Sequence, residues 1–84
     1  MPELDRLVRR LRGLSPSGWR YADRAQTIRR LAADLVAIGG AGHELPAVPD
    51  YALADVIAVV GEDAYAADPL ATEQLVAAAW GQLS

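Results

Sequence analysis

A long apolar stretch, residues 50–67 (DYALADVIAVVGEDAYAA), limits most strongly how this 84-residue chain can fold. Between positions 51 and 61 its only charged residue is Asp55. Wound as a helix, the stretch has an apolar face wider than the stripe of an ordinary surface helix, made of Leu53, Val56, Ile57, Val60 and Ala64 and extended by Ala52, Val59 and Ala66. A buried strand over residues 56–60 is the alternative, because periodicity does not separate the two for a short apolar run. Length, frequent alanine and the lack of a second strand candidate favour a helix covered on most of its circumference.

Three further segments carry apolar residues at the spacing of an amphipathic helix. They cover residues 2–12, 20–38 and 69–83, and together with residues 50–67 they predict four helices. The remaining strip of the 50–67 helix is expected to face solvent, and it consists of Tyr51, Asp55, Ala58 and Glu62. We therefore expect a single all-α domain over residues 1–84, a small four-helix bundle with the 50–67 helix at its centre.

Capping residues predict where these helices begin and end. Gly13 ends the first helix, and Gly39 with the glycine after it ends the second. The start of the second helix has two interpretations. Either Ser17 caps a helix that begins early, or Asp23 and Gln26 form a capping box.

The last helix has a clearer start, because Asp68 followed by Pro69 is typical of an N-cap with proline at the first helical position. Thr72 is a competing cap. The connection before residue 50 is unusual: residues 39–49 contain three glycines and two prolines, and exceed the link of about 2–8 residues common between bundle helices. We expect this segment to be a crossover or a hinge.

Size and composition favour a small protein that shares its apolar surface. A chain of 84 residues buries a limited core, yet 52% of this one is apolar, and it has no cysteine for a disulfide or a thiolate metal site. No apolar run approaches the roughly 20 residues that span a bilayer, and the N-terminus is unlike a signal peptide. We expect a cytoplasmic protein with no membrane partner. Its basic residues are all arginine, which together with abundant alanine indicates a GC-rich bacterial source.

Charge is divided unevenly along the chain. Residues 1–30 hold all eight arginines against three acids, for a net charge of +5, whereas residues 31–84 hold eight acids and no arginine, for −8. One interpretation is that the two halves neutralise each other within the fold or across a symmetric dimer. The other is that the basic half meets a nucleic acid or an acidic partner.

The chain lacks the residue patterns of a catalytic or metal-binding site. Its single histidine, His43, has no spaced second ligand and is interpreted as an exposed loop residue. The three serines lie in a turn (Ser15 and Ser17) and at the C-terminus (Ser84), which does not suit a Ser-His-acid set. The glycines of residues 39–44 (GGAGHE) are not followed by the Lys-Ser/Thr of a P-loop. We expect no enzyme activity, no cofactor and no metal.

Two family resemblances follow from size and helix count. The acidic layout of four helices in about eighty residues is similar to acyl carrier proteins, which attach a phosphopantetheine arm to a serine in an Asp-Ser-Leu setting at the start of their second helix. Here no serine lies between Ser17 and Ser84, so that role is not expected. Residues 27–40 (TIRRLAADLVAIGG) resemble the first part of a helix-turn-helix, but no basic recognition helix follows.

These observations predict a non-enzymatic protein-interaction module, an adaptor or accessory subunit that forms a homodimer and has itself or a second protein as its partner. The aromatic residues expected at the seam are Trp19, Tyr65 and Trp80. The alternative is a DNA-binding transcriptional regulator that contacts nucleic acid through its Arg-rich N-terminal half, with Arg9, Arg10, Arg29 and Arg30.

Overall fold

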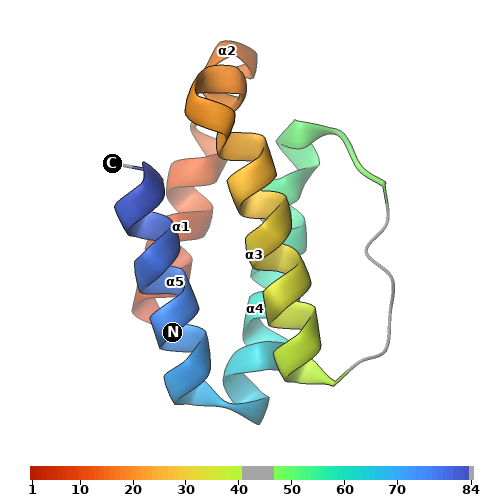
Figure 1. The fold of residues 1–84 in the computed structure, drawn as a ribbon, viewed down its shortest axis with the longest axis vertical. Helices are drawn as coiled ribbons and strands as arrows, with labels where there is room; N and C mark the ends of the chain where they lie inside the picture. The colour runs from red at the N-terminus through yellow and green to blue at the C-terminus, as the bar shows by residue number, and fades with distance from the viewer. Residues whose placement is uncertain (41–46, 84) are drawn as a thin grey trace.

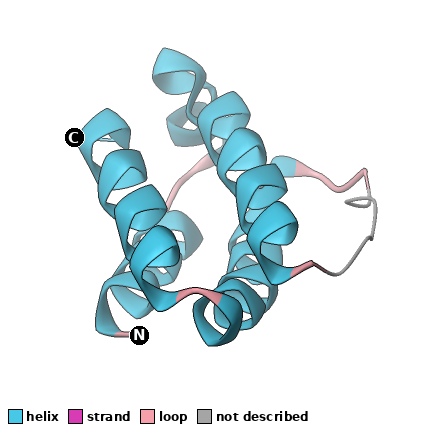
Figure 2. Cartoon of the chain, turned by 60° about the horizontal axis from the view of Figure 1, so that its bottom comes forward, coloured by secondary structure: helices cyan, strands magenta, loops and turns pink. Residues whose placement is uncertain are grey.

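The computed structural model describes residues 1–40 and 47–83 of the chain. Five α-helices follow in order: α1 (Pro2–Arg12), α2 (Pro16–Arg20), α3 (Arg24–Gly39), α4 (Leu53–Ala67) and α5 (Pro69–Leu83). Single 3₁₀ turns precede two of them, η1 (Tyr21–Asp23) before α3 and η2 (Asp50–Ala52) before α4. Figure 2 shows only helices and loops, and no strand occurs in the described residues. The predicted all-α fold is confirmed, and a strand within residues 56–60 is wrong.

The four long helices form two layers, with α3 and α5 in front of α1 and α4 (Figure 1). α1 runs antiparallel to α4, and α5 runs antiparallel to α3. By contrast, α3 and α4 run in the same direction, so α3 ends at the end of the bundle opposite to the start of α4. This topology agrees with the predicted crossover, although residues 41–46 themselves, and with them His43 and any hinge, lie outside the described residues.

The third long helix, α4, contacts α1, α3 and α5, as expected of a helix at the centre, and α5 likewise contacts the three other long helices. The inner row of α4 includes Ile57, which is fully buried with Leu53 and Ala64 in one core shared by all the long helices. The neighbours nevertheless cover less of α4 than its composition predicts. Val59 is 64% exposed and Ala66 is exposed as well, so the outer side of the helix keeps apolar side chains in solvent.

The predicted second helix, residues 20–38, corresponds to α3, and the short helix α2 lies before it, where a turn containing Ser15 and Ser17 was expected. A kink at Ala22 and Asp23 separates α2 from α3. Trp19 precedes Ile28 by nine residues, or about two and a half helical turns, so one straight helix would place them on opposite faces. Both side chains are buried in the core. The kink changes the direction of the chain so that both side chains face the core.

Of the two predicted starts of the second helix, Asp23 is at the correct position but forms no capping box, and Ser17 is not a cap. The cap of α2 is Ser15, whose side-chain oxygen accepts a hydrogen bond from the Gly18 amide at 3.1 Å. Asp23 does precede α3, but its side chain makes no capping hydrogen bond, and its own backbone is left-handed. The sequence pattern therefore predicted the position of this helix boundary, but the capping hydrogen bond on which the prediction was based is not formed.

The predicted start of the last helix is confirmed. The Asp68 carboxylate accepts a hydrogen bond from the Ala71 amide at 3.1 Å, with Pro69 at the first helical position. Thr72, the competing cap, is instead fully buried inside α5, and its hydroxyl donates to the Asp68 carbonyl oxygen at 2.9 Å.

Candidate interaction surface

A groove of about 420 Å³ runs between α1 and α4 on the layer opposite to α3 and α5. Its floor is apolar and consists of Leu4 and Val8 from α1 and Ala58 from α4. Its rim is charged and consists of Asp5, Arg9 and Arg12 from α1 and Glu62 from α4. An apolar floor inside a charged rim is the arrangement found at protein-protein interfaces, where the buried centre is apolar and the edge is polar.

Helical spacing explains why these side chains share the groove. Positions 5, 8, 9 and 12 follow one another at steps that place them on one flank of α1, and Ala58 and Glu62 lie four residues apart on the facing flank of α4. Gly61 brings the two helices together. A Cβ atom at this position would lie 2.7 Å from both terminal methyl carbons of Leu4, so a larger residue here would require Leu4 to move.

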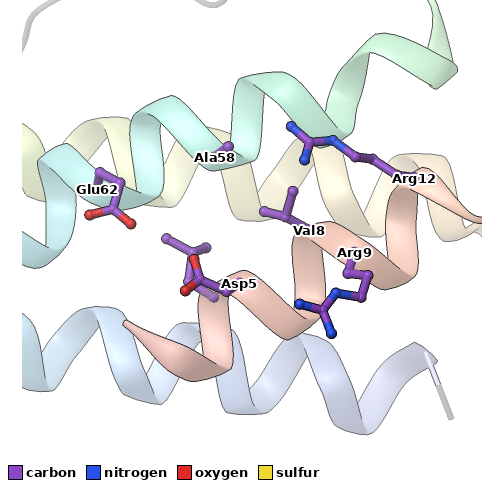
Figure 3. Close-up of a pocket in the computed structure, with 7 residues that line it drawn as sticks. Asp5, Val8, Arg9, Arg12, Ala58 and Glu62 are labelled. Atoms are coloured by element: carbon purple, nitrogen blue, oxygen red, sulfur yellow. The ribbon is translucent and has the colours of Figure 1, made fainter.

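The charges of the rim are separated along the groove. Figure 3 shows Asp5 and Glu62 at one end, reaching in from facing helices, and Arg9 and Arg12 toward the other end. At that second end the Arg12 guanidinium donates to the Asp55 carboxylate at 2.9 Å. The groove therefore has an acidic end and a basic end.

Three of these charges have no ion-pair partner among the described residues: Asp5, Glu62 and Arg9. Helical spacing alone predicts a pair between Asp5 and Arg9, which lie one turn apart. The structure does not form this ion pair. An exposed ion pair of this kind contributes about 0–1 kcal/mol to stability, so other contacts of the two side chains decide whether it forms.

Three other arginines contact residues that are distant in the sequence, and these are Arg12, Arg24 and Arg29. Arg29 donates to the Asp50 carboxylate and to the Val48 carbonyl oxygen, each at 2.8 Å. Arg24 donates to the Leu83 carbonyl oxygen at 3.4 Å, which ties the start of α3 to the last turn of α5. The two ion pairs, Arg12 with Asp55 and Arg29 with Asp50, agree with the interpretation that the basic and acidic halves neutralise each other partly within the fold.

The four arginines considered for nucleic-acid binding do not form one surface. Arg9 lines the groove between α1 and α4, whereas Arg30 lines a shallower groove between α3 and α5, in the other layer. Arg29 is engaged with Asp50 and the backbone, as described above. Arg9 and Arg10 are adjacent on α1, and both are exposed.

The three aromatic residues expected at a seam occupy different environments. Trp19 is 2% exposed and belongs to the core, so its ring is not available to a partner of the folded chain. Tyr65 is half-buried on α4, three residues beyond Glu62 and thus near the acidic end of the groove. Trp80 is half-buried on α5, away from this groove.

Sequence reasoning missed Val59 and Gly61. Val59 was expected to be covered but is exposed, and helical spacing did leave a signal, because Val59 lies four residues after Asp55 and three before Glu62, on the polar side of α4. Gly61 also left a signal, because a glycine in the apolar row of Ile57 and Ala64 is typical of close helix approach. Which helix makes that approach is visible only in the structure.

Within residues 1–40 and 47–83, no cluster of three or more histidine, cysteine, aspartate or glutamate side chains could hold a metal ion. None of the helices in these ranges has the length and apolar content needed to cross a membrane. No protein-family model matches the chain, and neither a curated protein nor a solved structure matches it significantly.

Proposed function

We propose that this protein is a non-enzymatic interaction module that self-associates as a homodimer and serves as an adaptor or accessory subunit in the cytoplasm. The observation that carries the proposal is the face formed by α1 and α4. It combines an apolar groove, the exposed side chain of Val59 and charges of both signs that have no ion-pair partner among the described residues. An apolar groove bordered by charge is typical of a surface that another protein covers.

The composition of α5 supports the same proposal. This helix of 15 residues contains one charged residue, Glu73, yet its outer side is exposed with Leu70, Ala77 and Gly81. Helices that are apolar around most of their girth are usually buried. A small chain without disulfides gains stability by covering such surface with a second copy.

Sedimentation equilibrium over nanomolar to high micromolar concentrations tests self-association directly. We expect a reversible monomer-dimer equilibrium, with the dimer populated in the micromolar range. A single monomeric species at every concentration would contradict the homodimer. A module that stays monomeric would have a different protein as its only partner.

The runner-up, a DNA-binding regulator, draws support from the exposed arginines of α1 that have no ion-pair partner among the described residues, Arg6, Arg9 and Arg10. It is less favoured because Arg29 is engaged and Arg30 belongs to the other layer. A duplex needs a continuous basic surface that follows its phosphates.

A further inference from the structure

We propose that two copies of this chain associate through the groove between α1 and α4, with the acidic end of each groove against the basic end of the other. The proposal rests on the proposed function, since it names the surface and the symmetry of the self-association. The partner that this surface fits is therefore a second copy, related by a two-fold axis that lies perpendicular to the helices.

The acidic end of the groove has no cationic partner in the described part of the chain. Asp5 and Glu62 face each other from α1 and α4 and lack an ion-pair partner there. Two neighbouring carboxylates repel, and a positively charged side chain placed between them offsets that repulsion. Arg9 is exposed, lies one turn from Asp5 and has no ion-pair partner among the described residues.

Symmetry decides which copy can supply the cation. A two-fold axis parallel to the helices would bring acidic end to acidic end and basic end to basic end, which is repulsive at both. An axis perpendicular to the helices, within the plane of the face, reverses one copy end for end. Arg9 of each copy then lies opposite Asp5 and Glu62 of the other, and the contact is made twice. The charge pattern therefore selects the second arrangement.

The face as a whole has the extent that such a dimer needs. Between the two charged ends lie Val8 and the partly exposed Ala58, and the next residue of α4, Val59, is exposed. The molecule measures 34 × 24 × 17 Å, and the layer of α1 and α4 forms one of its broad faces. A standard interface buries about 800 Å² per partner, comparable to a face of this size. The outer side of α5 has no charge pattern that would choose between orientations.

Charge reversal with complementation tests this arrangement. One variant carries Arg9→Glu, and a second carries Asp5→Arg with Glu62→Arg. Each of these side chains is exposed and unpaired, so both variants are expected to keep the wild-type circular dichroism and unfolding cooperativity. Each alone creates like-charge contacts at two symmetric places. We expect its dimer dissociation constant, measured by sedimentation equilibrium, to rise about tenfold or more.

Mixing the two variants is the decisive measurement. In a mixed dimer, the new glutamate meets the new arginines at one place, and the native Arg9 meets the native carboxylates at the other. We expect the mixture to form a heterodimer with an affinity within about threefold of the wild type. The control is Arg10→Glu, which makes the same charge change on the flank of α1 away from the groove and should leave dimerisation unchanged.

The outcomes separate this inference from the proposed function. If the wild type dimerises but the groove variants associate as the wild type does, then another face mediates the dimer. That result overturns this inference and leaves self-association in place. If the variants weaken the dimer but the mixture does not restore it, the end-to-end arrangement is wrong. A wild type that is monomeric at every concentration overturns both.

Discussion

At Gly61 the absence of a side chain allows α4 to pack closely against α1. The Cα of Gly61 lies against Leu4, which is buried, so an added methyl group meets a side chain with little room to move. Gly81, on α5, is the opposite case, because a Cβ there would meet no atom within 4 Å. The two positions are both helical and differ mainly in packing. They therefore separate the helix propensity of alanine from the cost of overpacking.

We expect Gly81→Ala to raise the free energy of unfolding by roughly 0.5–1 kcal/mol, because alanine is the better helix former. Gly61→Ala gains the same amount from propensity but loses about 1–3 kcal/mol to overpacking against Leu4, so it should be neutral or destabilising. Urea unfolding of both variants at matched protein concentration measures the difference. Equal stabilisation by the two substitutions would mean that α1 does not approach α4 this closely.

At the scale of a single element, the kink between α2 and α3 departs most from ordinary backbone preference. Ala22 and Asp23 adopt φ values of +51° and +55°, in the left-handed region. For a residue with a Cβ this region costs about 1–2 kcal/mol. The burial of Trp19 and the contacts of Arg24 with the Gly18 and Leu83 carbonyl oxygens offset that cost.

Ala22→Gly should therefore stabilise the protein, by up to about 1 kcal/mol, because glycine adopts the left-handed region without the steric penalty. The matched control is Ala33→Gly, at an exposed position inside α3, where the same substitution should destabilise by about 1 kcal/mol. Thermal and urea unfolding of the two variants measure the sign. Destabilisation by both would indicate that α2 and α3 form one continuous helix in solution.

At the scale of the whole molecule, the basic and acidic halves of the sequence do not form one basic face and one acidic face. Arg12 and Arg29 reach acids 43 and 21 positions away, so part of the basic half is neutralised inside the fold. The remaining arginines are distributed over both layers of the bundle, as Arg9 and Arg30 illustrate. No single continuous basic surface results from them.

We accordingly expect no sequence-selective binding of DNA or RNA at physiological salt. Filter binding over a salt series measures this, because a surface that neutralises several phosphates loses affinity steeply as salt rises. A variant with Arg9, Arg10 and Arg30 replaced by Gln, which leaves the contacts of Arg29 in place, is the control. Selective and strongly salt-dependent binding by the wild type, lost in that variant, would favour the DNA-binding regulator.

Much of the fold follows from signals that act within one or two helical turns. Gly13 ends α1 at the predicted place, and Asp68 with Pro69 starts α5 there, because capping depends on backbone groups at most four residues away. The central position of α4 follows from its apolar composition. These features depend on local chemistry, which a single sequence displays directly.

Other features were decided by packing between segments that are distant in the chain. Trp19 reaches the core only through a kink, and local propensity disfavours that kink because Ala22 has no preference for left-handed backbone. The candidate groove depends on which helix lies beside Gly61, and the pairing of Arg12 with Asp55 depends on α1 running antiparallel to α4. The sequence by itself determined the helices, most of their ends and the apolar excess. The tertiary structure alone decided which faces meet, because a contact between distant residues exists only once the whole chain has packed.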